Sequence, residues 1–569
     1  MRWLATLVVV TLFTPLARSE FPVFRLRDVG GAVVSSESFQ DAKAVVFVFL
    51  GTQCPVNNAY MPRLVELEER FAKDGVRLVG VNSNEHDSKD TIREHARAFK
   101  ISFPILRDEN QRLADVLGAQ RTPEAIVVDP RGVVRYRGRI DDQYGVGFQR
   151  PHPTKNDLVD AVAGVLAGKE TALAKSNASG CLIARAPRVK IDSTLTYAKD
   201  VAKIVQNRCL ECHRKGQIGP MPLLTYEDVS SWADMIKEVI VEKRMPPWHA
   251  DPRFGSFHND RSLTAAERDT FLRWIDGGCA RGDDKDLPAV KTFSDGWTIG
   301  TPDVVFEMPR AYNVPAKAPA RGVPYQYFVV PTKFTEDVWV RAAEVRPGNR
   351  AVVHHTLIYI IDGKRTGARV DGIGKGLLVS YAPGDIGSVY PAESAKRIPK
   401  GATLVFQMHY TPNGVAQTDR SQLGLVLAKE PPKHEVLSRA IAQQIIFLTP
   451  NRDNQKVQAN STFKEDVLIW ALAPHMHLRG KAFQFEATYP DGKTETLLSV
   501  PRYDFGWQAT YRLDRPLELP AGSSIKCTAL YDNSPNNLNN PDPTRFVTWG
   551  DQTWEEMMIG FVDYSVKKK

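Results

Sequence analysis

The spacing of apolar residues changes twice along this chain, and each change limits the folds open to the residues that follow. Up to about residue 170, strand-like and helix-like stretches alternate, which indicates a sheet with connecting helices. Helix-like patterns dominate between about 196 and 285, and short strand-like runs with Pro, Gly and Asn turns fill the chain beyond 296. A chain of 569 residues is too long for one core, so we expect several domains.

Composition and charge narrow the possible functions. The 43% hydrophobic and 25% charged residues are ordinary for globular proteins. The net charge of +8 comes from scattered Lys and Arg, with a basic run only at 567–569, so we expect no nucleic-acid partner. The expected segments are a signal peptide at 1–19, an α/β domain at 20–172, a linker at 173–195, an all-α domain at 196–285, and two all-β sandwiches of jelly-roll type at 296–440 and 445–569.

The first residues have the pattern of a secretory signal peptide. Arg2 precedes an apolar stretch at 4–16, and Ala17-Arg18-Ser19 resembles a cleavage site before Glu20. A retained membrane anchor is the alternative, although the apolar stretch is short for a span. No later segment is long and apolar enough to cross a bilayer. We therefore expect an exported protein without a stable membrane span, in the periplasm or outside the cell, in an oxidising compartment.

Within the first domain, a strand-like run at 44–50 leads into Cys54, and a helix-like pattern follows at 61–73. Further alternation predicts a parallel-type α/β sheet. A cysteine just before a helix N-terminus is placed to have a lowered pKa and to react as a thiolate. The later strands and helix of this domain are predicted at 76–81, 89–100, 103–106 and 125–129.

These features resemble the thioredoxin-like redoxin and peroxiredoxin group, because Cys54 lies at a strand-to-helix turn and 121–124 (Arg-Thr-Pro-Glu) is similar to the cis-proline loop that faces it. Asn57 stands where thioredoxins carry their second cysteine, so a local dithiol cannot form. Cys54 remains a candidate nucleophile towards a peroxide or a partner thiol, with another cysteine resolving it. The alternative is a structural or docking domain. The pairing of the other thiols stays open among Cys54, Cys181, Cys279 and Cys527.

The all-α domain carries the sequence Cys209-Leu210-Glu211-Cys212-His213. This C-x-x-C-H pattern is the attachment site of one covalent c-type haem, with both thiols bonded to the haem and His213 on the iron. A zinc half-site or a structural disulfide is the alternative.

A second axial ligand of the haem iron is expected after the helix-like pattern at 229–243. Met245 is the candidate because two prolines fix the backbone beside it. The domain resembles the class I cytochrome c fold, in which a Met on a later loop binds the far side of the iron. Packing in the haem pocket is the alternative role for Met245. The rival ligands are Met221, His249 and His258.

Three short motifs gather histidines in the β region. They are His354-His355, His409-Tyr410 and His475-Met476-His477. An imidazole-rich set without thiolate, with thioether sulfur from Met557 or Met558, suits copper better than zinc or magnesium. Side chains at i and i+2 leave the same face of a strand, so His475 and His477 can share an ion. His354 and His355 can do so only if their strand is bulged or ends there.

These motifs resemble the copper type II, ascorbate-dependent monooxygenases, namely peptidylglycine alpha-hydroxylating monooxygenase and dopamine beta-monooxygenase. The resemblance covers about the last 270 residues and implies two jelly-roll subdomains with one copper each. It implies that His354, His355 and His409 hold the electron-transfer copper, and that His475, His477 and Met557 hold the oxygen-activating copper. The family's disulfides are missing, since the region has only Cys527.

The resemblance implies a monooxygenase that uses O2 and two electrons to hydroxylate a small-molecule or peptide substrate of unknown identity. Ascorbate supplies electrons in the relatives, and here we expect an ascorbate-like donor or a redox protein, with the haem as relay. The alternatives are a haem and copper protein that only transfers electrons or senses redox state, and a thiol peroxidase that draws electrons through the haem.

Overall fold

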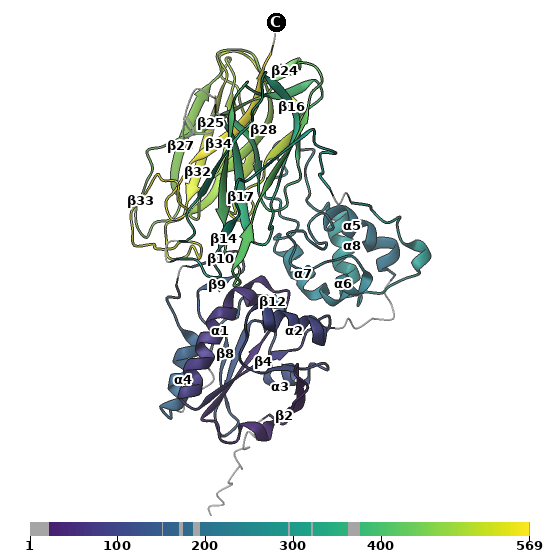
Figure 1. Ribbon diagram of the computed structural model, residues 1–569, viewed down its shortest axis with the longest axis vertical. Helices are drawn as coiled ribbons and strands as arrows, with labels where there is room; N and C mark the ends of the chain where they lie inside the picture. Colours follow the sequence, from purple (N-terminus) through teal and green to yellow (C-terminus); the bar gives the residue numbers. More distant parts are fainter. Residues whose placement is uncertain are drawn as a thin grey trace, which may run out of the picture.

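The computed structural model describes residues 22–150, 152–169, 174–185, 194–293, 296–319, 322–361 and 376–567, so the predicted signal peptide at 1–19 lies outside the described residues. An α/β unit, a helical unit and a larger β unit form three bodies, and the helical unit lies beside the other two (Figure 1). Within these ranges, no helix combines the length and apolar character needed to span a bilayer.

The α/β unit is built around an eight-stranded sheet. Its two central strands are buried except at Arg77, because helices cover the sheet. The expected parallel arrangement holds for β3, β4 and β5, whereas β7 pairs antiparallel with both β3 and β8. A turn at 129–133, in place of a crossover helix, joins β7 to β8 and reverses the chain. The strand order is β11 (Ala174–Lys175), β8 (Val134–Gly138), β7 (Glu124–Val128), β3 (Ala44–Phe49), β4 (Val76–Asn82), β5 (Ile105–Arg107), β1 (Arg25–Asp28) and β2 (Val33–Ser35).

Helices and short strand pairs complete this unit. The helices are η1 (Ser36–Phe39), α1 (Pro55–Lys73), α2 (Lys89–Ala98), α3 (Arg112–Leu117) and α4 (Asp157–Leu166). The pairs are β9 (Tyr144–Gly145) with β10 (Phe148–Gln149), and β6 (Arg121–Thr122) with β12 (Cys181–Leu182). The pairing of β12 with β6 changes the expected organisation. Residues 174–185 were predicted as part of a linker, but they pack on the α/β unit.

The helical unit contains no strand among its described residues. The predicted helix at 229–243 is interrupted at Trp232, which caps one helix and begins the next. The last helix begins with a reciprocal capping box formed by Thr264 and Glu267. Its elements are η2 (Tyr197–Val201), α5 (Ala202–Arg208), α6 (Tyr226–Ser231), α7 (Ala233–Val241), α8 (Ala265–Asp276) and η3 (Asp284–Asp286).

The β unit begins with a sandwich of two sheets around one apolar core. One sheet contains β13 (Val304–Glu307), β23 (Gln422–Leu427), β16 (Val338–Arg346), β20 (Ser394–Ile398) and β24 (His434–Glu435), with β19 (Ser388–Val389) beside β16. The other contains β15 (Gln326–Pro331), β21 (Thr403–Tyr410), β17 (Val353–Ile361) and β18 (Leu377–Tyr381). A separate pair joins β14 (Tyr312–Val314) to β22 (Gln417–Asp419).

A second sandwich follows with its own core. One sheet contains β25 (Leu437–Ala442), β34 (Ile559–Val566), β28 (Val467–His475) and β31 (Tyr511–Leu519). The other contains β27 (Gln455–Thr462), β32 (Ser524–Tyr531), β29 (Gly480–Thr488) and β30 (Thr494–Val500), and β26 (Phe447–Leu448) pairs with β33 (Val547–Thr548). The histidine motifs lie at the ends of β17, β21 and β28, where the two sandwiches meet.

Candidate metal centre

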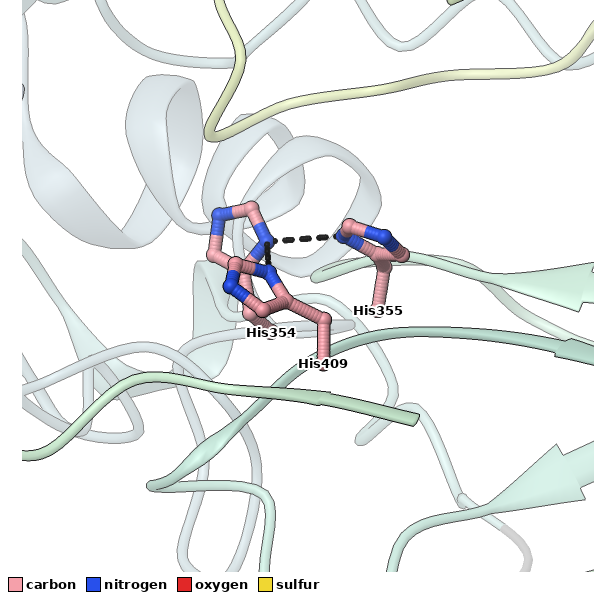
Figure 2. Close-up of side chains that lie close together, drawn as sticks. All are labelled: His354, His355 and His409. Atoms are coloured by element: carbon pink, nitrogen blue, oxygen red, sulfur yellow. Dashed lines mark hydrogen bonds between the residues drawn. The ribbon is translucent and has the colours of Figure 1, made fainter. Parts of the chain in front are cut away.

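A bulge in β17 brings the adjacent histidines to one side. Val353 pairs with Tyr410 and His355 pairs with His409, so the register shifts by one residue and His354 is the extra residue. The bulge turns both rings towards the ring of His409 on β21, as expected for neighbours that face one site. Figure 2 shows the three imidazoles converging from these two strands.

In each of the three rings, Nδ1 is the nitrogen that faces the other two histidines. Nδ1 of His354 lies 2.9 Å from Nδ1 of His355 and 3.3 Å from Nδ1 of His409. Burial lowers the pKa of His354 to about 4 and lowers the pKa of His355 and of His409 well below the usual value. Neutral imidazoles with nitrogen lone pairs gathered at one point form a donor set for a metal ion.

Aromatic side chains fix the orientation of these imidazoles. The Tyr325 hydroxyl lies 2.8 Å from Nε2 of His355, and the Tyr325 ring stacks on His409 with centroids 4.9 Å apart. Phe505 stacks on His354 at a centroid distance of 4.9 Å. When Nε2 of His355 carries the proton and donates it to Tyr325, its Nδ1 is left free as a ligand.

The second histidine set lies where β28 ends. His475 is the last residue of the strand, and its ring centroid is 5.2 Å from that of His477. Nδ1 of His475 lies 2.6 Å from Oε1 of Gln508, and Nδ1 of His477 lies 3.2 Å from the carbonyl oxygen of Glu555. Nε2 of His477 is buried without a hydrogen-bond partner. This set therefore offers Nε2 of His477 as a ligand, whereas the first set offers Nδ1 atoms.

A buried carboxylate holds His477 beside 555–558. Glu556 accepts the amide of His477 at 2.9 Å and the amide of Arg479 at 2.6 Å. Burial raises the pKa of Glu556 to about 7, against the opposing effect of the Arg479 charge. Met558 is fully buried in the core of the second sandwich, whereas Met557 is half-buried and its carbonyl accepts the Tyr531 hydroxyl at 2.7 Å. Of the two sulfurs, the one on Met557 is therefore free of the core.

Gln508 joins the two histidine sets. Its Oε1 contacts His475 and its Nε2 lies 3.4 Å from Nδ1 of His355. The ring centroids of His355 and His475 are 6.3 Å apart. The two sets thus form one cluster at the junction of the sandwiches. No sequence pattern singled out Gln508, Tyr325 or Glu556, because each acts through a partner distant in sequence.

Cavities reach the cluster from two sides. One, of about 470 Å³, has His355 and His475 in its wall together with apolar residues such as Leu378 and Leu472. The other, of about 1050 Å³, borders His354 and receives wall residues from the β9–β10 hairpin of the α/β unit. The first cavity therefore borders both histidine sets and has the volume typical of small-molecule sites.

The C-x-x-C-H motif forms a tight turn after α5. The amides of Cys212 and His213 donate to the carbonyl of Cys209 at 3.1 and 2.9 Å. Nδ1 of His213 lies 2.9 Å from the Met221 carbonyl, so the imidazole donates there and leaves Nε2 free. A Cβ on Gly219 would lie 2.8 Å from this ring, so only glycine permits the close approach. These contacts fit an axial haem ligand.

The candidate second ligand lies just beyond α7. The amide of Met245 donates to the Val239 carbonyl at 3.2 Å, and the residue is half-buried. Among the rivals, Met221 is buried in the helical core, while Nδ1 of His258 lies 3.2 Å from the Leu513 carbonyl. Burial lowers the pKa of His249, and the charge of the Asp504 carboxylate opposes this effect. His249 and His258 thus face the second sandwich.

The haem motif also faces the β unit. A Cβ placed on Gly384 would lie 3.4 Å from Sγ of Cys212 and 3.6 Å from the ring of Trp507. Trp507 is followed by Gln508 and lies two residues after Phe505. The loop at 505–508 therefore contacts both histidine sets, and Gly384 lies near both this loop and the C-x-x-C-H motif.

Cys54 stands at the N-cap of α1. Its thiol donates to the carbonyl of Thr122 at 2.9 Å, and the Thr122–Pro123 bond is cis, as the resemblance implied. Asn57 is fully buried where a second cysteine would have stood. Cys181, whose partner was left open, lies against Cys54, with its amide 3.4 Å from Sγ.

Known proteins match the first part of the chain. A model of the AhpC/TSA family matches residues 17–137. Thiol-disulfide oxidoreductase ResA of Halalkalibacterium halodurans is 28% identical over 111 residues, which are 20% of this chain and 61% of that relative. Chloroplastic peroxiredoxin Q of Populus jackii is 24% identical over 133 residues, or 22% of this chain and 61% of the relative. The chain thus spans less than two thirds of these relatives.

Among solved structures, a hypothetical protein of Sinorhizobium meliloti is 27% identical, with a TM-score of 0.26, and the match covers 29% of this chain and 92% of that one. The α/β fold, the cis-proline loop opposite Cys54 and the family match agree for the N-terminal unit. This unit of the chain is a thioredoxin-like redoxin domain of the AhpC/TSA type, joined to a large all-β region.

Proposed function

We propose that the chain is a copper-dependent monooxygenase that hydroxylates a small organic substrate with O2. The observation that carries this proposal is the histidine cluster between the sandwiches. Three Nδ1 atoms converge on one point, and the ring of His475 lies 6.3 Å from that of His355. A second pair of histidines with an unpartnered buried Nε2 on His477 supports a further ion.

The chemistry of the donors favours copper. The first set, His354, His355 and His409, offers imidazole nitrogen alone, and the second adds thioether sulfur from Met557 to His475 and His477. The nearby carboxylate of Glu556 is occupied by two backbone amides, so neither set resembles the oxygen-rich sites of magnesium or calcium. Copper at the two sets would supply one-electron redox chemistry and the activation of O2.

The chain's own residues bind and orient the substrate. A substrate bound in the cavity of about 470 Å³ would lie beside His475, and the apolar part of the wall would limit the access of water to the reacting carbon. Tyr325 holds His355, while Gln508 holds His475. Hydroxylation consumes two electrons and two protons besides O2, so an electron donor is part of the proposal.

Cys209, Cys212, His213 and Met245 are the residues that would hold a haem, which would supply electrons one at a time. The closeness of Cys212 and Trp507 to the same residue, Gly384, supports a relay from the helical unit to the β unit. An ascorbate-like donor or a redox protein would reduce the haem. The proposal includes export. The signal-peptide pattern predicts it, and the c-type haem and the metal ligands are expected to function in that same compartment.

The test is the reaction of the reduced protein with O2. Wild type with two coppers and one haem should be reoxidised rapidly, with copper needed for fast reoxidation of the haem. The Met557→Ala variant should keep the haem and lose the fast phase. Rapid reoxidation of the haem without copper would refute the relay. Haem without copper in the purified protein would favour the alternative of a plain electron carrier.

Thiol chemistry in the redoxin domain is a second candidate function. The observation that favours it is Cys54, at a helix N-terminus and opposite the cis-proline loop in a domain of the AhpC/TSA type. Peroxide turnover that is independent of copper and lost in Cys54→Ser would establish it. Peroxide turnover that persists in Cys54→Ser would remove it.

A further inference from the structure

Two cysteines far apart in sequence meet at the edge of the redoxin domain. Cys54 and Cys181 are separated by 127 positions, yet the amide of Cys181 lies 3.4 Å from Sγ of Cys54. Neither cysteine is in a disulfide, and the thiol of Cys54 accepts the Cys181 amide. Strand β12, which begins at Cys181, pairs with Thr122 beside the cis-proline. The backbone thus holds the second thiol against the first.

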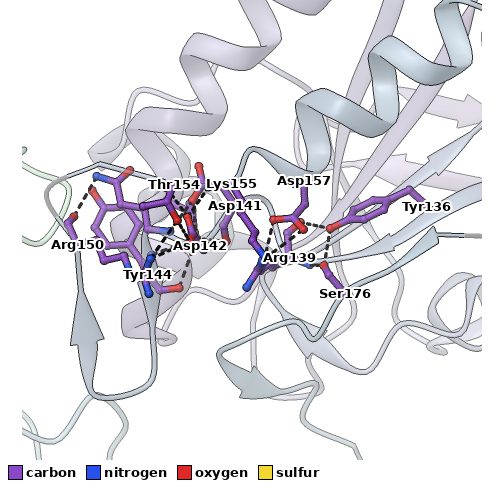
Figure 3. Close-up of polar contacts among 12 residues, drawn as sticks. Tyr136, Arg139, Asp141, Asp142, Tyr144, Arg150, Thr154, Lys155, Asp157 and Ser176 are labelled. Carbon is purple, nitrogen blue, oxygen red and sulfur yellow. Dashed lines mark hydrogen bonds and ion pairs between the residues drawn. The ribbon is translucent and has the colours of Figure 1, made fainter. Parts of the chain in front are cut away.

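The segment that carries Cys181 contacts the redoxin domain at two places before the cysteine. Upstream, β11 pairs with β8, and Oγ of Ser176 lies 2.6 Å from the Tyr136 hydroxyl and accepts the Arg139 amide at 3.1 Å (Figure 3). Directly before Cys181, Gly180 has φ +144, and a Cβ there would lie 2.1 Å from the Thr122 carbonyl oxygen. Only glycine can therefore precede Cys181 at this close approach.

The helical unit covers both thiols. Cys54 is 1% exposed and Cys181 8% exposed, and they belong to one apolar cluster with helical residues such as Met235. The amide next to Cys181 lies 3.4 Å from the Met235 sulfur. Beside the cluster, Arg121 of the redoxin domain pairs with Glu238 of α7 at 2.6 Å. An external partner thus reaches the thiols only when this contact opens.

We propose that Cys54 and Cys181 form a redox-active pair that alternates between dithiol and disulfide, with the second thiol supplied by the segment that follows the redoxin domain. This pair replaces the local dithiol that Asn57 precludes. The proposal does not depend on copper or haem.

The reaction with an external disulfide balances as follows. The Cys54 thiolate attacks one sulfur of the external disulfide, whose S–S bond breaks and releases the first thiol. The Cys181 thiol then attacks Sγ of Cys54, forms the internal disulfide and releases the second thiol. Two electrons pass from the cysteines to the external disulfide, and the two cysteine protons end on the released thiols.

Electrostatics support this division of roles. Burial alone would raise the pKa of Cys54, but hydrogen bonds, first that with the Cys181 thiol and then that with the Asn57 amide, lower it to about 7. The hydrogen bond with Cys54 and burial raise the pKa of Cys181 well above its usual value. Cys54 is thus the attacking thiolate and Cys181 the resolving thiol.

The test equilibrates the full-length protein with mixtures of reduced and oxidised glutathione, followed by acid quenching, alkylation, digestion and mass spectrometry. We expect a peptide in which Cys54 is bonded to Cys181, rising from none to nearly all of the protein across the series and disappearing again on reduction. Cys54→Ser and Cys181→Ser should abolish this peptide.

The matched control is Cys279→Ser, because Cys279 is 1% exposed in the same apolar cluster but belongs to the helical unit. This variant should keep the linked peptide at the wild-type level. The proposal is overturned if the native wild type gives no linked peptide at any mixture, if the peptide forms only after unfolding, or if Cys54 bonds equally to Cys279.

Discussion

Removing the hydroxyl group of Tyr325 tests how the first histidine set is held. The hydroxyl lies 2.8 Å from Nε2 of His355, and Tyr325 is 8% and His355 4% exposed, so water cannot replace the contact easily. In Tyr325→Phe the ring still stacks on His409, so the change removes one hydrogen bond and little packing. We expect the variant to fold and to bind copper more weakly at this set.

The magnitude follows from the burial and the geometry. One neutral hydrogen bond contributes about 0.5–1.5 kcal/mol to folding stability, so unfolding should shift only slightly. A partner that fixes the tautomer of a ligand histidine contributes about 10–100-fold in metal affinity, or about 1.4–2.7 kcal/mol. The effect on copper should therefore exceed the effect on the free energy of unfolding.

The assay is competition for copper against a chelator, with urea unfolding of the metal-free protein alongside. Tyr327→Phe is the control, because Tyr327 lies on the neighbouring strand β15, is exposed, and accepts a hydrogen bond from Nε2 of Gln407 at 3.0 Å. That variant should bind copper as wild type does. Unchanged copper affinity in Tyr325→Phe would show that the hydrogen bond at Nε2 does not hold His355 as a copper ligand.

Three further predictions concern the sulfur ligand and the redoxin domain. Met557→Ala should lose one copper with little change in unfolding, whereas Met558→Ala should lose about 2–5 kcal/mol of stability, because Met558 is fully buried in the core. Alkylation of Cys54 should speed up as pH rises through about 7 and then level off, because the folded pKa lies near that value. The midpoint should move upward in Cys181→Ser, and a midpoint unchanged there would contradict the hydrogen bond. Glu238→Ala removes ion pairs beside the apolar cluster that contains Cys54. The variant should make the alkylation of Cys54 several-fold faster, as measured by mass spectrometry against time.

Local patterns were enough to predict the strands that carry the ligands. Short strand-like runs are expected beyond residue 296, and two of the histidine motifs lie at the ends of such strands, Thr403–Tyr410 and Val467–His475. The condition placed on His354 and His355 is met by the bulge in β17. Short-range periodicity controls these features, so they can be predicted from the sequence.

Long-range contacts escaped prediction for a physical reason. Cys181 lies in a stretch of small and polar residues with two-residue strands, which leave no periodic signal. Its meeting with Cys54 depends on the cis-proline loop and on Gly180, which are distant from Cys54 in sequence. Gln508 likewise contacts both histidine sets from a loop, and only the packing of the two sandwiches brings it there.

The central claim is that the histidine cluster holds two copper ions, and anomalous X-ray diffraction at the copper edge tests it most directly. Crystals of the purified protein should show two copper peaks. One should lie among the Nδ1 atoms of His354, His355 and His409, and the other beside His475 and His477, within reach of the Met557 sulfur. Anomalous signal at the zinc edge alone, or copper bound elsewhere in the chain, would contradict the account.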